Sequence, residues 1–447
     1  MSKVDHLKSP NPDPGEAYPH INVQLFGDFI PEKNWKKKVP SSKCRLIEYF
    51  LGEMRKPWNL PQQQPLQTPT MNGFVADYIS SFHHYMKRLP SREEYSIIMN
   101  CFPGNSIPVL QGLARNFGVF DHWFCSVPSQ TWCNRAFFQA GTSSGLVVNS
   151  PYIDWLENTA STIMNHISEA KKKGVDWKVY FDPRNKLPAS LIINFPALRQ
   201  YWPKHFCYME QFYEDLERGE LPAYSFIEPS LLRDNNDMHP LTTKSGSLPT
   251  SNILLADKLI HRIYNAIRTK GDYGQDTAFM ITFDEHGGCF DHVPPGSATP
   301  PEPGAPEGQL DFTFNRLGVR VPTVLVSSYV EPGSVFSEEY EHTSIIKTIS
   351  NKWGIKGLTK RDMSPCVKDI SGAFNRSEPL HPSEWKEIPL SKETPPEEWM
   401  DDDHPAHDMQ KALAGLARAH ARLPETSLDT ILQVEDAMSE AKKELFR

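Results

Sequence analysis

The sequence predicts an α/β fold, in which a mostly parallel β-sheet carries helices on both faces. From about residue 105 onwards, apolar runs of strand length alternate with longer segments of helical periodicity. The runs TAFMITF (277–283) and VRVPTVLVSSYV (319–330) are dominated by apolar residues, which is typical of strands buried on both faces of a sheet. Strands that alternate with helices in this way indicate a parallel sheet covered on both sides.

The expected helices combine apolar periodicity with a stop signal at the C-terminal end. The clearest can begin at Ser251, a good capping residue, and ends at Gly271. Residues 1–75 are rich in Pro, Asn and Gln, and we expect little regular structure there. Helices are expected over residues 76–89, 107–118, 155–174, 205–219, 251–271 and 343–354. Strands are expected over residues 119–124, 176–182, 223–229, 277–283 and 319–330.

The composition changes near residue 370, where Pro, Glu and Lys become frequent. Two amphipathic helices are expected beyond this point, over about 407–421 and 427–445. We therefore expect a main domain over residues 1–369. Residues 370–447 would form a Pro-rich, acidic linker and a helical appendage that takes no part in the sheet.

Charge and apolar patterning exclude several classes of protein. The chain has 47 basic and 55 acidic residues, a net charge of −8, which argues against nucleic acid as the main partner. No apolar run approaches the length of a transmembrane segment, and the N-terminal residues lack the apolar stretch of a signal peptide. As written, the sequence predicts a soluble, cytoplasmic chain.

The stretch DEHGG (284–288) follows the expected strand 277–283 directly. Ligands of open α/β sheets bind beyond the carboxyl ends of the strands, which is the position of this stretch. Asp284 and Glu285 would repel each other if buried together, and a divalent metal ion would resolve that repulsion. The alternative is a solvent-exposed acidic turn.

A second candidate lies in VPSQTWCNRAFFQAGTSSG (127–145). Thr131 stands between an expected strand and what looks like a helix, where helix N–H groups favour a nucleophile or a phosphate. Asn134 and Arg135 could hold phosphate oxygens or simply fix the turn. The alternative for Thr131 is an ordinary capping residue.

Histidines in loops form the third candidate group. His239 lies in NDMHP (236–240), beside Asp237, and His342 lies in YEHTS just before an expected helix. Neutral histidine is a common metal ligand and a candidate acid for protonating a leaving group. A single histidine is more often structural, but two of them after strands, on the side of DEHGG, favour function.

Seven phrases together resemble the phosphoesterase family, which contains bacterial phospholipases C, plant non-specific phospholipases C and related acid phosphatases. They occur in order within residues 11–365. The resemblance implies an alkaline-phosphatase-like α/β core. It also implies hydrolysis of phosphate esters, such as phospholipids or small phosphoesters, through a phospho-enzyme beside a divalent metal ion. The phrases are MNGFVADY, FDHWFCSVPSQTWCNRAFF, AYSFIEP, NDMHP, TFDEHGGCFDHVPP, RLGVRVPTVLVSSYVEPG and YEHTSIIKTI.

Roles for individual residues follow from that resemblance. Thr131 matches the position of the family's nucleophile, and Asp284 and Glu285 match metal ligands. Three histidines match those that line the phosphate pocket, one of which would protonate the leaving oxygen; they are His239, His286 and His342.

The resemblance is broken near the N-terminus. Family members typically open with a buried strand and a motif like E-N-R-S-F-D-H, whose Glu and Asn complete the metal site, but here MSKVDH leads directly into LKSPNPDPGEAY. Glu16 stands where similar plant members carry His, and we assign it no role. We therefore expect residues 1–369 to be a catalytic domain that lacks an N-terminal segment. Phospholipase C-type hydrolysis is the first interpretation, and a phosphomonoesterase or a catalytically defective relative are the alternatives.

Overall fold

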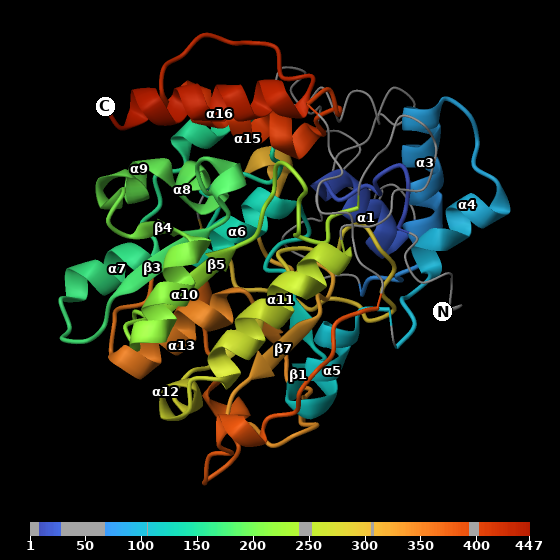
Figure 1. Cartoon of the computed structure of the whole chain (residues 1–447). Helices are drawn as coiled ribbons and strands as arrows, with labels where there is room; N and C mark the ends of the chain where they lie inside the picture. The colour runs from blue at the N-terminus through green and yellow to red at the C-terminus, as the bar shows by residue number, and fades with distance from the viewer. Residues whose placement is uncertain (1–8, 28–67, 105, 241–252, 305–307, 393–401) are drawn as a thin grey trace.

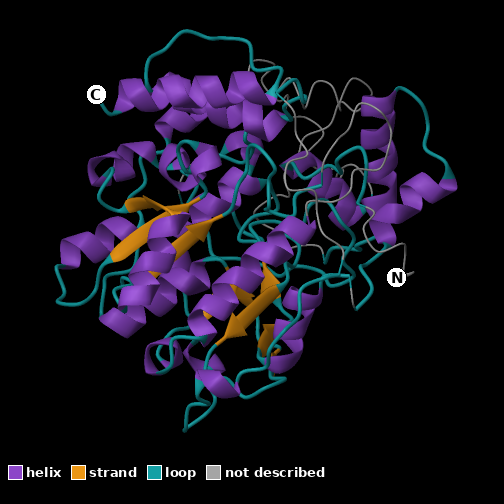
Figure 2. Cartoon of the chain, in the orientation of Figure 1, coloured by secondary structure: helices purple, strands orange, loops and turns teal. Residues whose placement is uncertain are grey.

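The computed structural model describes residues 9–27, 68–104, 106–240, 253–304, 308–392 and 402–447. Helices lie around two groups of strands (Figure 1, Figure 2). The described strands form three separate sheets of four, three and two strands, where the sequence predicted one. The α/β class is confirmed, but the prediction of a single sheet was wrong; the strands are short, with two to five residues each.

The four-stranded sheet has the order β6-β7-β1-β8. β7 is antiparallel to both β6 and β1, and β1 is parallel to β8. Every residue of β7 is buried, as predicted, but β6 lies at the sheet edge and is mostly half-buried. The prediction that 277–283 is buried on both faces was therefore wrong. The bounds are Phe279–Ile281 for β6, Thr323–Val326 for β7, Gly118–Phe120 for β1 and Val335–Phe336 for β8.

The three-stranded sheet, with the order β4-β3-β5, is parallel throughout. Its central strand β3 is almost entirely buried, because helices cover it. The third sheet pairs β2 with β9, also in parallel. Four of the six strand pairings are thus parallel, as the alternation of strands and helices predicted. The bounds are Phe206–Tyr208 for β4, Trp177–Phe181 for β3, Tyr224–Glu228 for β5, Trp123–Phe124 for β2 and Tyr340–Glu341 for β9.

Most long helices occur where the sequence predicted them. These are α3 (Phe74–Met86), α5 (Pro108–Asn116), α6 (Thr131–Ala140), α11 (Ile253–Arg268), α13 (Thr343–Trp353), α15 (Asp408–His420) and α16 (Ile431–Leu445). Shorter helices are α4 (Arg92–Ser96), α8 (Ala189–Ile193), α9 (Phe195–Leu198), α12 (Asp272–Gln275) and α14 (Lys360–Met363). None of the described helices is long and apolar enough to span a membrane.

Two predicted helices are shorter than expected. The 155–174 helix reduces to α7, Ile163–Ala170, because Thr162 caps a new start: its hydroxyl accepts a hydrogen bond from the Asn165 N–H. In the 205–219 segment, the first residues join β4 beside β3, and α10 covers only Met209–Arg218. Both misses have the same cause, since neither a cap nor a strand partner is visible in apolar periodicity.

One helix was missed altogether. α1 covers Tyr18–Phe26, within a segment expected to be irregular, and it ends at Gly27 with a positive φ. It is buried on all sides from Tyr18 to Leu25, so its sequence lacks the contrast between an apolar and a polar face that reveals a helix. The expected gap after His6 lies outside the described residues and stays a prediction.

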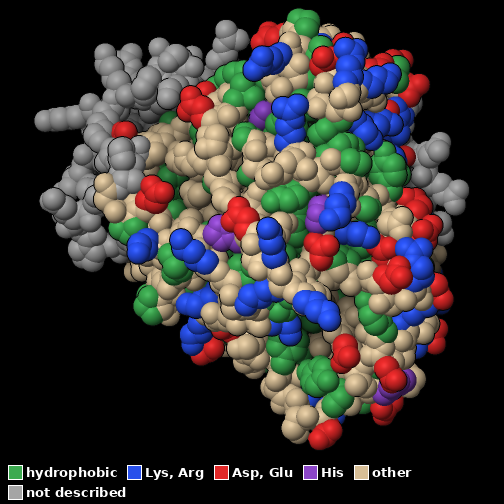
Figure 3. Space-filling model, turned by 90° about the vertical axis from the view of Figure 1, so that its left-hand side faces the viewer, with side chains coloured by type: hydrophobic (Ala, Val, Ile, Leu, Met, Phe, Trp, Pro, Cys, Tyr) green, Lys and Arg blue, Asp and Glu red, His purple; other side chains and the backbone are tan. Residues whose placement is uncertain are grey.

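The C-terminal helices α15 and α16 pack against each other and lie over α8 and α9 (Figure 1). Their buried residues, such as Leu413 and Val434, belong to the same apolar cluster as Trp155 and Ile192 of the main domain. The hydrophobic core therefore has no break at the predicted domain boundary after residue 369. On the face shown in Figure 3, basic and acidic side chains are interspersed.

Candidate functional site

A buried asparagine fixes the loop that leads into α6. The Asn134 amide accepts a hydrogen bond from the Val127 N–H at 3.1 Å and donates to the Ser129 carbonyl at 2.7 Å. Asn134 is fully buried. Of the two roles considered for it, these contacts favour fixing the turn over binding phosphate.

Thr131 is the first residue of α6 and is 7% exposed. Within the described part of the chain, its hydroxyl makes no hydrogen bond, so the oxygen is not committed to a structural role. The next N–H, of Trp132, donates to the Asn149 side chain at 3.2 Å. One N–H of this helix end is therefore already occupied, and the remaining ones can still favour an anion.

Arg135 connects α6 with the acidic loop. It lies one helical turn after Thr131 and so on the same face. Its Nε donates to Asp284 Oδ2 at 2.7 Å, and its Nη1 lies 3.7 Å from the buried Glu228 carboxylate. Burial opposes the charged guanidinium, but Asp284 and Glu228 outweigh it and raise the pKa of Arg135. Arg135 thus neutralises two carboxylates and places Asp284 beside the first turns of α6.

Glu285 has a different environment from its neighbour Asp284. Its side chain is 5% exposed and accepts a hydrogen bond from the Gly287 N–H at 2.6 Å. It also shares a hydrogen bond with the carboxyl group of Glu16. Burial, together with Glu16, raises the pKa of Glu285 well above its ordinary value. Two hydrogen-bonded carboxyl groups must share a proton or bind a cation.

His239 lies against the same carboxylates. Its Nε2 is 3.0 Å from Asp13 Oδ2, its Nδ1 is 4.0 Å from Glu16 Oε2, and its backbone N–H donates to Asp237 Oδ1 at 3.0 Å. Burial lowers the pKa of His239, but Asp13 and Glu16 outweigh it and raise that pKa well above the ordinary value. The site therefore gathers Asp13, Glu16, Asp237, Asp284 and Glu285 around one arginine and one histidine.

The other two predicted histidines support the site from behind. His342 is fully buried; its Nδ1 accepts from the Trp123 indole N–H at 3.2 Å, and its Nε2 lies 2.8 Å from the Asp284 carbonyl oxygen. Burial lowers the pKa of His342. With both ring nitrogens engaged, this imidazole is neutral and orients the acidic loop. The structure gives it no free proton donor for a leaving group.

His286 is turned towards α1. Its Nε2 lies 2.8 Å from Gln24 Oε1, and the Gln24 amide in turn donates to Asp77 at 2.8 Å. Burial lowers the pKa of His286 to about 3. His286 is therefore a neutral bridge between the acidic loop and α1. Of the three predicted histidines, His239 is the one that borders open space.

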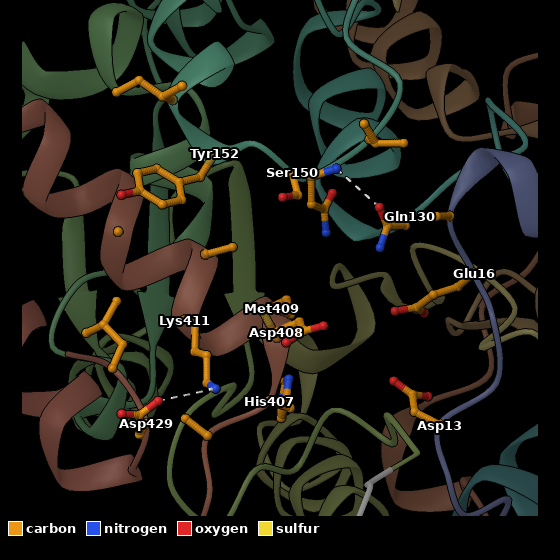
Figure 4. Close-up of a pocket in the computed structure, with 18 of the residues that line it drawn as sticks. Asp13, Glu16, Gln130, Ser150, Tyr152, His407, Asp408, Met409, Lys411 and Asp429 are labelled. Atoms are coloured by element: carbon orange, nitrogen blue, oxygen red, sulfur yellow. Dashed lines mark hydrogen bonds and ion pairs between the residues drawn. The ribbon is translucent and has the colours of Figure 1, made fainter. Parts of the chain in front are cut away.

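That open space is a cavity of about 1110 Å³. One side of the cavity is lined by Asp13, Glu16 and His239. Across from Asp13 and Glu16 lie residues of α15 and of the loops that flank it, within 405–429 (Figure 4). His407, at the start of α15, stacks on His239 with ring centroids 5.4 Å apart. Gln130, immediately before Thr131, lines the cavity as well, whereas Thr131, Asp284 and Glu285 are not among the described residues that line it. α15 and the loops that flank it are thus part of the site's surroundings.

Sequence reasoning missed Asp13 and Glu16. They lie in NPDPGEAY (11–18), which contains no strand–loop–helix pattern. The available signal was two acids, three positions apart, in a short Pro- and Gly-containing segment. Only the fold brings that segment to His239 and Glu285.

Comparison with known proteins assigns the family. The sequence profile described as "Phosphoesterase family" matches residues 32–356. Non-specific phospholipase C5 of Arabidopsis thaliana is 33% identical over 355 residues, covering 76% of this chain and 62% of that protein. Non-specific phospholipase C4 of the same plant is 30% identical, covering 80% and 60%. Phospholipase C B of Mycobacterium tuberculosis is 26% identical, covering 66% and 60%. The chain spans about three fifths of the length of these relatives.

Solved structures give a more distant likeness. The lipoteichoic acid synthase LtaP from Listeria monocytogenes superposes with a TM-score of 0.38 at 12% identity, covering 76% of this chain and 85% of that one. A protein in the alkaline phosphatase superfamily from Vibrio parahaemolyticus gives 0.35 at 12% identity, covering 61% and 64%. On the profile and the plant sequences, the chain belongs to the phosphoesterase family.

Proposed function

We propose that this chain hydrolyses phosphate esters, with phosphodiesters of polar lipids as its substrate class and Thr131 as its nucleophile. The observation that carries the proposal is the ion pair between Arg135 and Asp284. It joins the first turns of α6, where Thr131 has an uncommitted hydroxyl, to the loop that carries Glu285, whose pKa is raised by burial and by Glu16. A nucleophile beside a group of charged side chains is the arrangement that phosphoryl transfer requires.

In the proposed reaction, Thr131 Oγ1 attacks phosphorus as the bond from phosphorus to the leaving alcohol breaks. The hydroxyl proton passes to a carboxylate or to water, and the leaving alkoxide takes up a proton. Water then attacks the phosphothreonine, which releases the phosphate product and restores the hydroxyl. Arg135 holds Asp284 in place through both steps, and the buried His342 keeps the Asp284 backbone fixed.

A divalent cation fits the donor set around Glu285. Glu285 and Glu16 share a hydrogen bond in a buried place, which a cation would replace by a favourable contact with both carboxylates. Asp284 fits less well, because Arg135 already neutralises it, although a carboxylate oxygen can accept more than one contact. A bound divalent ion would stabilise negative charge on the phosphoryl oxygens.

We take the cavity, which reaches Gln130 beside the proposed nucleophile, as the space for the substrate, and its size favours a diester with a bulky substituent over a small monoester. Its volume of about 1110 Å³ exceeds the range of roughly 300–1,000 Å³ typical of small-molecule sites. Its lining includes apolar side chains such as Val148, Ile153 and Met409 beside the acids. The named relatives are phospholipases C. A phosphomonoesterase is the second candidate, and comparing a synthetic phosphodiester with the matching monoester separates the two.

The Thr131 assignment is tested by substitution. Thr131→Ala should lower kcat for a synthetic phosphodiester by about a thousandfold or more, whereas Thr131→Ser should keep part of the activity. Thr131→Val, of the same shape, controls for folding through its melting temperature. Full activity in a well-folded Ala variant would overturn the assignment. Tight binding of phospho-ligands without turnover by the wild-type chain would instead support the defective relative, which the absence of an E-N-R-S-F-D-H stretch favours.

A further inference from the structure

We propose that Asp13, Glu16 and His239 form a divalent-cation site on the wall of the cavity. Neither acid lies within residues 32–356, the part that matches the family profile, so nothing in that match assigns them a role. The proposal extends the proposed function, since it names chain residues that would hold the ion. Its measurement is cation binding, which does not require turnover.

The geometry is close to that of a metal site. One donor atom from each of the three residues lies within 4.8 Å of the other two. Two ligands about 2.1 Å from a tetrahedral metal are about 3.4 Å apart, so modest rotation of the side chains would bring the donors together. The Asp13–His239 contact, at 3.0 Å, is already at such a distance.

A second observation points to a ligand in the same place. In the described part of the chain, no N–H group donates to Glu16 Oε2, a buried oxygen on a residue only 8% exposed, and only a proton shared with Glu285 could satisfy this carboxyl group. It faces His239, and the carboxylates of Glu16 and Asp13 both point into the space in front of the cavity wall (Figure 4). Leaving a buried carboxylate oxygen unpaired is costly, and a bound cation would remove that cost.

The segment that carries the two acids is fixed against the acidic loop. A side chain on Gly288 would collide with Pro14 and with the Gly15 carbonyl, since its Cβ would lie 2.6 Å from one and 2.7 Å from the other. The Gln24 side-chain amide donates a hydrogen bond to the same Gly15 carbonyl oxygen at 2.5 Å. The two loops therefore meet backbone to backbone, and the donors of Asp13 and Glu16 are pre-positioned beside Glu285.

The donor set indicates the class of ion. Two carboxylates and one imidazole suit a borderline ion such as Zn²⁺ or Mn²⁺, whereas Ca²⁺ and Mg²⁺ prefer oxygen donors alone. His407 stacks on His239 and so keeps the imidazole plane in place. Asp13, Glu16 and His239, with Glu285 beside Glu16, would still leave coordination positions open towards the cavity for an ion that takes about five or six ligands.

The competing explanation is that protons alone neutralise the cluster. His239 in its charged form would pair with Asp13, and Glu16 would share a proton with Glu285. In that case protons would balance all the charges of the cluster in the metal-free protein, and added Zn²⁺ or Mn²⁺ would not bind at a specific site.

Calorimetric titration of the full chain, stripped with chelator and then dialysed, separates these explanations. We expect one equivalent of Zn²⁺ or Mn²⁺ to bind, and Ca²⁺ to bind much more weakly. Glu16→Gln and Asp13→Asn should each weaken the binding roughly tenfold or more. Asp408→Asn, which removes an acid from the facing wall of the same cavity, should leave it unchanged. Unchanged affinity in Glu16→Gln would overturn the proposal.

Anomalous diffraction from wild-type crystals soaked in Zn²⁺ provides a test that needs no variant. A peak between Asp13, Glu16 and His239 would support the site, and a fully occupied peak elsewhere, or none, would refute it. Binding at this site in a protein with no hydrolytic activity would refute the proposed function but leave the site intact. Hydrolysis by a protein that binds no ion would refute the cation site but leave the proposed function intact.

Discussion

Asp284 and Glu285 are neighbours in the sequence, yet the structure neutralises them in different ways. Asp284 is a quarter exposed and is paired with Arg135 at 2.7 Å. Glu285 is buried, and its carboxyl group meets another acid, Glu16. The charge of Asp284 is balanced within the protein by Arg135. The carboxyl group of Glu285 instead needs a proton or a bound cation, because its neighbour Glu16 is also an acid. Two adjacent acids therefore do not amount to two equivalent ligands, and charge partners decide which of them is available.

The largest effect should come from removing the built-in cation. Arg135→Met would leave Asp284 without its partner and the fully buried Glu228 without its nearest charge. Breaking a buried pair typically costs about 3–5 kcal/mol, and urea unfolding measures the loss. The half-exposed Arg218 is a matched control, because Arg218→Met removes a solvent-screened ion pair and should cost far less stability.

The double variant makes this prediction sharper. If uncompensated charge is the cause, Arg135→Met with Asp284→Asn should recover part of the lost stability. A double variant as unstable as the sum of the single ones would show instead that Arg135 acts through packing.

The next effect concerns the ion. A cation at 100 times its dissociation constant should stabilise the wild-type protein by about 2.7 kcal/mol, so that chelator lowers the melting temperature by several degrees. Glu285→Gln should remove most of this sensitivity, and Asp284→Asn should remove less of it. Equal losses in the two variants would contradict the contrast drawn between these neighbours. If chelator does not change the melting temperature, Asp284 and Glu285 bind no cation and are simply part of a polar turn.

Sequence reasoning could propose only those candidate residues that carry a local pattern. Thr131, Asp284 and Glu285 follow or precede regular elements, and α6 and β6 are present where their patterns predicted them. Asp13 and Glu16 could not be found in this way, because their role arises only from contact with residues far along the chain. α1 could not be predicted for a related reason: distant parts of the chain bury it on all sides, so its sequence has no periodic alternation of apolar and polar residues.

The histidines show a second limit of sequence reasoning. His239, His286 and His342 have equal claims in the sequence, yet only His239 borders the cavity. The other two are engaged with Gln24 and with the Asp284 backbone. Residue type and position after a strand do not reveal which way a ring faces.

The smallest effect is a dependence of stability on pH. In the folded protein the pKa of Glu285 is raised well above its ordinary value of 4.5. The folded state therefore holds this proton more tightly than the unfolded chain does. The resulting stability is fully present below the unfolded pKa and is lost as the pH rises through the folded pKa. In chelator, the free energy of unfolding should fall above about pH 4.5, by up to about 1.4 kcal/mol per pH unit.

Glu285→Gln should flatten that slope, and Glu169→Gln, at an exposed position, should not change it. Urea unfolding at a series of pH values gives both slopes. A wild-type stability that rises over this range would mean that Glu285 is ionised and already compensated within the protein.

The residues of the acidic cluster come from distant parts of the chain. Asp13 contacts His239 across 226 residues, Arg135 contacts Asp284 across 149, and Gln24 contacts His286 across 262. Contacts of such separation are costly to close and form late. During synthesis, Asp13 and Glu16 leave the ribosome first and remain in water until Glu285 has been made. At the proposed cation site, an ion would therefore bind only after the two loops have met, and a bound ion would indicate a folded chain.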